Sequence, residues 1–139
     1  MSESGNVEIV KRGYEAFGRG DIETLLGLFE DGIEWVTPGP PELLSAGRRR
    51  GKQEVAGFFQ TLSEMYTFER FEPKQFIAQG DTVVVFGDDR VRIRATGSPF
   101  DFEWVHVFEF RDGKVARFRE YGDMTPIVAG FRAAQTVAR

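Results

Sequence analysis

The sequence predicts an α+β domain in which a curved antiparallel sheet wraps over three N-terminal helices and a short C-terminal helix follows. Two observations lead to this fold class. Up to about residue 62, apolar residues recur every three or four positions, which is the period of amphipathic helices. From about residue 68 the period becomes two, with turn residues between the segments, as in strands joined by hairpins. Helices followed by such a meander pack as a sheet over a helical layer.

The length and composition fit a single globular domain that spans residues 1–139. The net charge of −4 and the isoelectric point near 5.1 argue against nucleic acid or an anionic membrane as the main partner. The absence of cysteine excludes disulfides and thiolate chemistry. The sequence contains no apolar signal segment and no apolar run of membrane-spanning length, so we expect a cytoplasmic protein without a membrane partner.

Three helices are expected in the first half of the chain. The first covers residues 7–17 and ends near Gly18–Gly20, where two glycines interrupt the pattern. Asp21 is a suitable N-cap for a second helix over residues 22–29. The third helix carries the apolar residues between positions 55 and 62.

A short strand over residues 32–37 lies between the second and third helices. It ends at Pro38–Pro41, because proline fixes the backbone and removes a hydrogen-bond donor. We expect residues 42–51 to form an exposed loop, and the run Arg48–Arg50 within it to be solvated charge.

Four strands are expected after the helices. They lie within residues 68–79, 82–95, 100–110 and 114–123. The pair Thr125-Pro126 then opens a short C-terminal helix, since threonine caps helices well and proline fits the first helical position.

The strand from Phe100 to Phe110 has the most informative pattern in the chain. Side chains alternate between faces along a strand, so the even-numbered residues share one face. These residues are Phe100, Phe102, Trp104, His106, Phe108 and Phe110. Because His106 is the only histidine and has large apolar neighbours, we expect it to face an enclosed space of ligand size.

Charge sets the expected register of the hairpin before this strand. With a turn at Thr96–Pro99, Arg94 pairs with Asp101 on the outer face, and Asp89 pairs with His106 on the aromatic face. A slip by one residue would place arginines among the aromatic rings, at the cost of burying unpaired charge.

The following hairpin allows two turns. A two-residue turn at Asp112-Gly113 would bring two arginines onto the aromatic face. A three-residue loop with Gly113 in the left-handed conformation brings Phe118 and Glu120 there instead, and burial favours this alternative. Phe118 then lies opposite His106, and Glu120 lies opposite Trp104.

Asp89, His106 and Glu120 therefore converge from three adjacent strands, and we predict that they are catalytic. Burial raises the pKa of a carboxyl group, whereas a neighbouring imidazolium lowers it. Such a cluster can hold an acid and a base near neutral pH. The alternative is a polar cluster that only orders the sheet.

Seven further residues are predicted to contact a ligand. They are Trp35, Phe59, Trp104, Phe108, Phe118, Tyr121 and Asp123. The two tryptophans also fit a buried core, and Asp123 fits a cap at the strand end. One histidine among scattered carboxylates makes a poor metal site, and no phosphate-binding glycine motif occurs, so we expect no metal and no cofactor.

Several phrases of the chain are similar to a known family. They are YEAFGRGD (14–21), LLGLFEDGIEWVTPGPP (25–41), RGKQEVAGFF (50–59), FIAQGDTVVV (76–85) and HVFEFRDGKVARFREYGD (106–123). With them the chain resembles the SnoaL-like, ketosteroid-isomerase-related branch of the nuclear-transport-factor-like superfamily. The resemblance implies a cone-shaped fold and a homodimer that pairs through the outer face of the sheet. It leaves activity open, since the family includes isomerases, polyketide cyclases, epoxide hydrolases, dehydratases and binding domains.

The positions that carry catalysis in ketosteroid isomerases do not match. Those enzymes use a tyrosine and two aspartates, and the corresponding residues here are Gly13, Thr37 and His106. Tyr14 is one residue away from the tyrosine position, which is about 100° around a helix. Steroid isomerisation by that mechanism is therefore not expected.

Epoxide hydrolases of the limonene type match in part. Their two aspartate positions correspond to Asp89 and Glu120, both acidic, which supports a cavity position for these two residues. Their arginine, tyrosine and asparagine positions correspond to Gly87, Glu34 and Val36.

The leading hypothesis is a cofactor-independent acid–base enzyme, an isomerase, cyclase or hydrolase, that acts on a small apolar molecule in the cavity. Asp89 or Glu120 would serve as the base, and His106 as proton donor or orienting group. The alternatives are a non-catalytic domain that binds a small molecule and a dimerisation module with a filled cavity.

Overall fold

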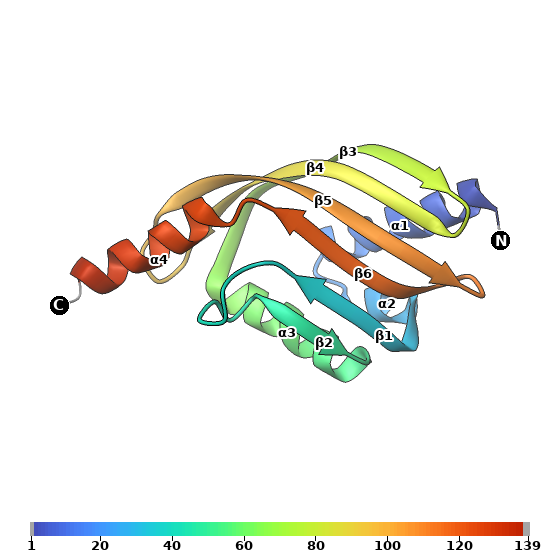
Figure 1. The fold of residues 1–139 in the computed structure, drawn as a ribbon, viewed down its shortest axis with the longest axis horizontal. Helices are drawn as coiled ribbons and strands as arrows, with labels where there is room; N and C mark the ends of the chain where they lie inside the picture. Colours follow the sequence, from blue (N-terminus) through green and yellow to red (C-terminus); the bar gives the residue numbers. More distant parts are fainter. Residues whose placement is uncertain (1, 138–139) are drawn as a thin grey trace.

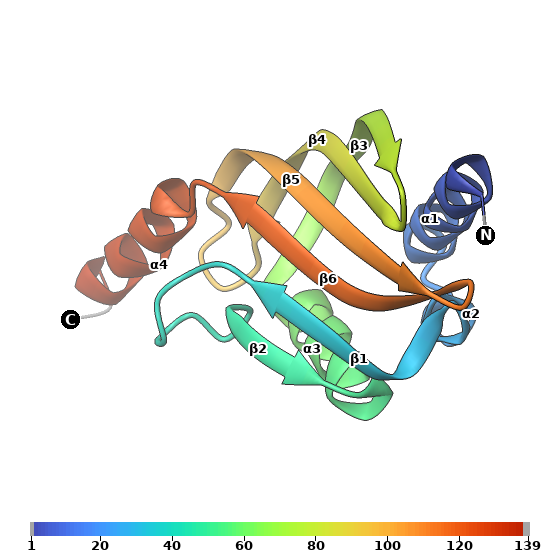
Figure 2. The ribbon, with the colours of Figure 1, turned by 45° about the vertical axis from the view of Figure 1, so that its right-hand side comes forward.

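The computed structural model describes residues 2–137 and confirms the α+β class. A curved six-stranded sheet arches over three helices, and a fourth helix extends from one end of the sheet (Figure 1). A view turned by 45° shows how the sheet curls around the helical layer (Figure 2). Met1, Ala138 and Arg139, which the single-domain prediction includes, lie outside the described residues.

The first two helices begin where the sequence provides caps. Ser2 Oγ accepts a hydrogen bond from the Gly5 N–H at 2.9 Å, and Asp21 Oδ1 accepts one from the Thr24 N–H at 3.1 Å. Gly20 links these helices at a φ of 73°, a left-handed conformation that glycine adopts without strain. Within residues 2–137 the helices are α1 (Glu3–Gly18), α2 (Ile22–Gly27), α3 (Lys52–Met65) and α4 (Thr125–Val137).

The sheet has one parallel pair. Its strands are β1 (Phe29–Thr37), β2 (Gly47–Arg50), β3 (Tyr66–Gln79), β4 (Thr82–Ile93), β5 (Pro99–Arg111) and β6 (Lys114–Gly122). Their order in the sheet is β2-β1-β6-β5-β4-β3, and all neighbours are antiparallel except β1 and β6. The sequence predicted an antiparallel sheet. The β1–β6 pair departs from this because a helix and four strands separate its members, so no tight hairpin ties their directions.

Two segments in the first half of the chain differ from the prediction. Phe29, expected at the end of the second helix, begins β1. Arg48–Arg50, expected in an exposed loop, form the edge strand β2. Alternation explains this strand: Arg48 and Arg50 both contact the Glu34 carboxylate, whereas the Arg49 guanidinium lies over the Phe58 ring.

The β4–β5 hairpin keeps the predicted faces but not the predicted register. Asp89 lies opposite Phe102, whereas the sequence placed it opposite His106. The register differs by an even number of positions, so the same side chains stay on the concave face. Asp89 is therefore buried there, with only 4% of its surface exposed.

The difference in register arises at the turn, which begins at Arg94. The backbone N–H of Arg94 donates to the Met65 carbonyl, and its guanidinium donates to the Tyr66 carbonyl. These bonds hold Arg94 outside the β4–β5 ladder. The predicted ion pair of Arg94 with Asp101 is therefore wrong, and Arg90 pairs with Asp101 at 3.1 Å.

The β5–β6 hairpin has the two-residue turn that the sequence analysis did not favour, but its side chains lie on the faces that the sequence predicted. Asp112 and Gly113 form a two-residue turn at φ values of 49° and 79°. A bulge at Ala116 then adds one residue to β6 and restores the inward direction of Phe118 and Glu120. The pairs are Phe108 with Phe118 and His106 with Glu120, in place of the predicted His106 with Phe118 and Trp104 with Glu120.

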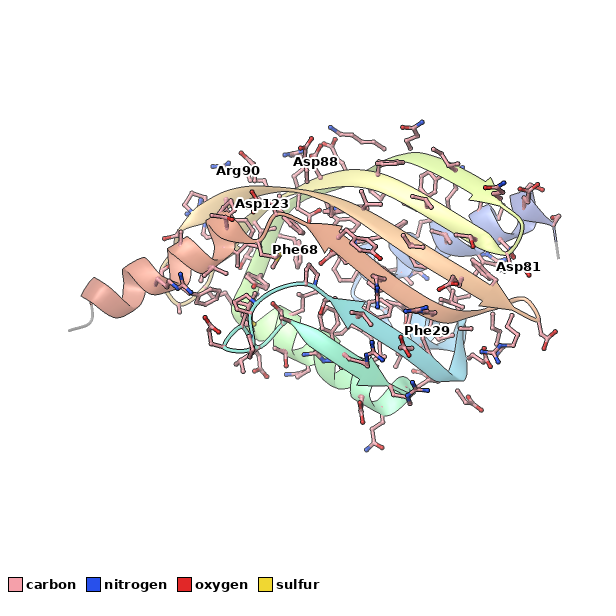
Figure 3. All side chains as sticks on the ribbon, in the orientation of Figure 1. Phe29, Phe68, Asp81, Asp88, Arg90 and Asp123 are labelled. Atoms are coloured by element: carbon pink, nitrogen blue, oxygen red, sulfur yellow. The ribbon has the colours of Figure 1, made fainter. Side chains whose placement is uncertain are left out.

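The two faces of the sheet differ in character. In Figure 3, Phe68 lies beneath the sheet, whereas Asp88 and Arg90 lie above it on the convex face. That face also carries a partly exposed apolar band between its ion pairs. The convex apolar band consists of Ile77, Val84, Phe86, Val105, Val107 and Tyr121. The homodimer through this face stays a prediction.

No helix between residues 2 and 137 has the length and apolar character needed to cross a membrane. The cytoplasmic location stays a prediction.

Candidate functional site

A cavity of about 120 Å³ lies between the concave face of the sheet and the helical layer. Aromatic and aliphatic side chains from α1, α3 and the strands form most of its wall. A void of roughly 150 Å³ in another protein holds benzene, so this volume suits a molecule of about that size. The polar side chains in the wall are Tyr14, Thr37, Ser45, Tyr66, Asp89, His106 and Glu120.

His106 is the centre of a hydrogen-bonded chain. Its Nδ1 lies 2.8 Å from Tyr14 Oη, and its Nε2 lies 2.7 Å from Glu120 Oε2. The helix α1 brings Tyr14 from the helical layer that faces the concave side of the sheet, and the register of β5 and β6 places Glu120 directly opposite His106. The predicted meeting of His106 and Glu120 is therefore present, and Tyr14 completes the chain.

The state of Tyr14 determines how protons are arranged in this chain. Burial, together with the negative charges of Glu120 and Asp89, raises the pKa of Tyr14 well above its ordinary value. Tyr14 therefore keeps its proton and donates it to Nδ1, which leaves Nε2–H to donate to the Glu120 carboxylate. Both ring nitrogens of His106 are thus occupied by protein groups, whereas Glu120 Oε1 has no partner among residues 2–137.

Asp89 lies on the neighbouring strand in a drier environment. Its Oδ1 accepts a hydrogen bond from Trp104 Nε1 at 2.7 Å, and the structure gives Oδ2 no partner within the described chain. Burial raises the pKa of Asp89 to about 7, and the nearby charge of Glu120 adds to this effect against the lowering by the Trp104 bond. Asp89 is therefore partly protonated at neutral pH and has an oxygen free for a ligand.

Trp104 supports both parts of the site without lining the cavity. Its ring stacks on His106 at a centroid distance of 3.8 Å and on Phe71 at 5.3 Å. Gly87 lies directly opposite, and a Cβ at that position would come within 2.5 Å of the Trp104 ring. The glycine makes room for the indole that holds both His106 and Asp89 in place.

A group of three hydroxyl side chains lies beside Glu120. The parallel ladder pairs Val36 with Arg119, so the next residue of β1, Thr37, is adjacent to Glu120. Thr37 Oγ1 donates to the Ser45 carbonyl at 2.5 Å, and Ser45 Oγ lies 3.2 Å from Tyr66 Oη. These three residues line the same cavity as the chain centred on His106.

The structure places most of the predicted ligand contacts in the wall but not all of them. Trp35, Phe59, Phe108 and Phe118 line the cavity, as do Asp89, His106 and Glu120. Trp104 belongs to the layer behind the wall.

Tyr121 and Asp123 lie elsewhere, which corrects their predicted cavity positions. Tyr121 is 50% exposed on the convex face because the Ala116 bulge places odd-numbered residues of β6 outward. Asp123 accepts a hydrogen bond from the Thr125 N–H at 3.0 Å, so it caps the start of α4.

Sequence reasoning missed the contribution of Tyr14, Ser45 and Tyr66. In the sequence comparison, Tyr14 is treated only as lying one residue away from the tyrosine position of ketosteroid isomerases. Its polar tip, on the helix that covers an aromatic strand with a histidine, was the available signal. Ser45 lies just before β2 and Tyr66 begins β3, so their contact depends on how the β1–β2 pair and the β3–β4 pair are placed, which the sequence pattern does not reveal.

Within the described part of the chain, no three histidine, cysteine, aspartate or glutamate side chains lie close enough to hold a metal ion. The expectation that the protein works without a metal or cofactor stays a prediction.

The sequence model of the SnoaL-like domain matches residues 10–118. The chain belongs to the SnoaL-like family. This confirms the resemblance seen in the sequence, and the fold agrees with it. Among curated proteins, none is significantly similar to this chain.

Solved structures of SnoaL-like and NTF2-like proteins share the whole fold. An NTF2-like protein from Burkholderia xenovorans LB400 is 38% identical, with 94% of this chain and 98% of that chain covered and a TM-score of 0.85. An NTF2-like protein of unknown function from Burkholderia pseudomallei K96243 is 28% identical, with the same coverage and TM-score. TerC, co-crystallised with polyporic acid, is 29% identical, with 92% and 98% covered and a TM-score of 0.80.

Proposed function

We propose that this SnoaL-like protein is a cofactor-independent acid–base enzyme that acts on a small, mostly apolar molecule in the cavity. The observation that carries the proposal is the pair of carboxyl groups, Glu120 and Asp89, that face one apolar cavity, each with one oxygen that no described residue engages. Burial raises the pKa of Asp89 to about 7, so in this proposal Asp89 acts as the acid near neutral pH and Glu120 as the base.

Each residue has a distinct role in this proposal. Glu120 takes a proton from the ligand through its free oxygen, and Asp89 in its neutral form donates a proton to the ligand. His106 is a positioning residue, because both of its nitrogens are already engaged with Tyr14 and Glu120. Its hydrogen bond fixes the orientation of Glu120 and stabilises the negative charge of the Glu120 carboxylate before it gains a proton.

The family and one relative support a small organic molecule as the ligand. Proton transfer of this kind fits the isomerases, cyclases and hydrolases that the SnoaL-like resemblance implies. TerC, at 29% identity, was co-crystallised with polyporic acid. The assay panel therefore consists of simple apolar carbonyl compounds and epoxides of about one ring, which suit the cavity of about 120 Å³, with polyporic acid as a larger, acidic comparison.

The test is the isosteric variant Glu120→Gln, assayed on that panel for turnover and for binding. We expect turnover to fall at least about a hundredfold, since a positioned general base contributes about that much, while affinity changes only a few-fold. Glu109→Gln is the matched control, because Glu109 is on the same sheet but contacts Arg117 on the convex face. Equal activity of Glu120→Gln and Glu109→Gln would reject the role of Glu120.

A second candidate function is a non-catalytic domain that binds a small molecule. The observation that favours it is the closed hydrogen bonding of His106, which leaves the imidazole no free nitrogen for chemistry. In that case the wild-type protein binds members of the panel and turns over none, and Glu120→Gln alters affinity alone.

A further inference from the structure

The hydroxyl groups of Ser45 and Tyr66 carry two protons, and only one of them takes part in a hydrogen bond within the described part of the protein. Each hydroxyl carries one proton, and one hydrogen bond joins the two oxygens at 3.2 Å. Whichever group donates, the proton of the other has no acceptor among residues 2–137. Within the described chain, the one side-chain hydrogen bond of Thr37 is the bond that it donates to the Ser45 carbonyl, and its Oγ1 accepts none from Ser45 or Tyr66.

This spare donor is built into the cavity wall. Ser45 and Tyr66 are 6% and 5% exposed, and both line the same cavity as Glu120 and Asp89. A buried hydroxyl donor without an acceptor costs free energy that a ligand oxygen would recover. The rings of Phe68 and Phe100 pack against Tyr66 and cover part of this position with apolar surface.

We propose that Ser45 and Tyr66 form a second polar subsite of the cavity, which binds a neutral acceptor oxygen of the ligand. This inference rests on the proposed function, since it requires a ligand in the cavity, and it narrows that ligand to a compact, uncharged molecule with a carbonyl or similar oxygen. The cavity volume of about 120 Å³ suits a single six-membered ring.

The surroundings select a neutral oxygen over an anionic one. Burial and the negative charge of Glu120 raise the pKa of Tyr66, although its bond with Ser45 acts in the opposite direction. The same negative potential opposes an anion at this position. An uncharged carbonyl oxygen accepts the proton without that repulsion.

Two probes of nearly equal shape test the subsite. Cyclohexanone carries the acceptor oxygen, and methylenecyclohexane replaces it with a CH₂ group. We expect the wild-type protein to bind cyclohexanone about three- to tenfold more tightly, as one added hydrogen bond implies, and to bind cyclohexanecarboxylate more weakly than either. Equal affinity for the first two probes, or preferred binding of the carboxylate, would overturn the proposal.

The double variant Ser45→Ala/Tyr66→Phe assigns the preference to these hydroxyls. It should bind both neutral probes with equal affinity, whereas Tyr14→Phe should keep the preference, because the Tyr14 proton is already committed to His106. A preference that survives in the double variant would place the acceptor contact elsewhere and reject the subsite.

Infrared spectroscopy gives an answer even if the double variant does not fold. The carbonyl stretch of cyclohexanone bound to the wild-type protein and to Tyr14→Phe should lie below its value in an apolar solvent. An unshifted stretch in both proteins would contradict the proposal. These measurements concern binding alone, so loss of the subsite and loss of the Glu120 role are separate outcomes.

Discussion

Asp88 and Asp89 are neighbours in β4, and their pKa values move in opposite directions. Asp88 lies on the convex face, where hydrogen bonds from Lys74 and Arg70 hold its pKa below the ordinary value. Asp89 lies on the concave face, where burial raises its pKa to about 7. The two carboxyl groups belong to the same strand and differ only in the face on which they lie.

The comparison shows how the two faces of one sheet place neighbouring carboxyl groups in different environments. The ion pairs on the convex face are in contact with solvent, so each pair contributes little to stability. On the concave face Asp89 and Glu120 have no arginine or lysine partner among the described residues, and burial raises the pKa of Asp89 into the range that the proposed proton transfer needs.

The largest expected effect comes from breaking the chain centred on His106. His106→Leu keeps a side chain of moderate size but leaves the Tyr14 hydroxyl and the Glu120 carboxylate without partners. We expect the free energy of unfolding to fall by about 3 kcal/mol, because each abandoned buried group costs roughly 1–3 kcal/mol. Urea denaturation at neutral pH measures the change.

Val107→Leu is the neighbouring control for this variant. Val107 is the next residue in β5 and lies on the convex face, where conservative substitutions change stability by less than about 0.5 kcal/mol. If His106→Leu were as mild as this control, the concave cluster would not be the stabilising network that its geometry implies.

Asp89→Asn should remove the pH dependence of stability that the buried carboxyl group imposes. Between its unfolded pKa near 3.8 and its folded pKa of about 7, the folded protein holds more protons than the unfolded chain. The free energy of unfolding therefore falls as pH rises through this range, by about 2–3 kcal/mol between pH 5 and pH 8. Asn still accepts from Trp104, so the variant should lose this dependence and be more stable than wild type at pH 8.

Asp88→Asn should change the pH dependence of stability in the opposite direction. The folded pKa of Asp88 is lowered, so its ion pairs stabilise the protein above the ordinary aspartate pKa and are lost as pH falls through the folded value. Asp88→Asn should therefore reduce stability at pH 8 and lose the difference in acid. Parallel pH profiles for the two variants would contradict the assignment of the two faces.

The faces of the sheet could be predicted from the sequence because they depend only on period two. Asp89, His106, Phe118 and Glu120 all lie on the concave side, as expected. The partners across the strands could not be predicted in the same way. They depend on turn length and bulges: the spacing of Val115 and Phe118 shows that β6 holds one extra residue, but not whether the turn or a bulge at Ala116 accommodates it.

The site residues that the sequence did not predict were missed for one physical reason. Tyr14 meets His106 across 92 positions of sequence, and Thr37 meets Glu120 through a parallel pairing without a hairpin. Contacts of this range are set by how helices and strands pack, not by local periodicity. The helix pattern placed Tyr14 on a buried face and could not say which strand residue it would touch.

The predicted homodimer would bury part of the convex face, which differs from the concave face in being partly exposed in the single chain. Phe86, at the centre of the convex apolar band, is 40% exposed although it is a large apolar side chain. We expect a second copy of the chain to cover it, since an apolar strip between charged strips of both signs suits a self-complementary interface. Phe86→Glu should weaken association at least about tenfold in sedimentation equilibrium, while Lys74→Glu at the rim of the face has a smaller effect. A wild-type protein that is monomeric at high concentration would reject the dimer.

The smallest effect is expected for an ion pair on the convex face. Arg90 and Asp101 lie 3.1 Å apart with their side chains 42% and 67% exposed, so water screens their attraction. A double-mutant cycle with Arg90→Ala and Asp101→Ala should give a coupling of at most about 0.5 kcal/mol, and added salt should reduce it further. Arg70 also lies 3.7 Å from Asp101, so part of this small coupling passes to Arg70 when Arg90 is removed. A coupling energy as large as the loss of stability in His106→Leu would mean that the convex face is buried in solution. The ion pairs of that face would then stabilise the protein as much as the hydrogen-bonded chain in the cavity does.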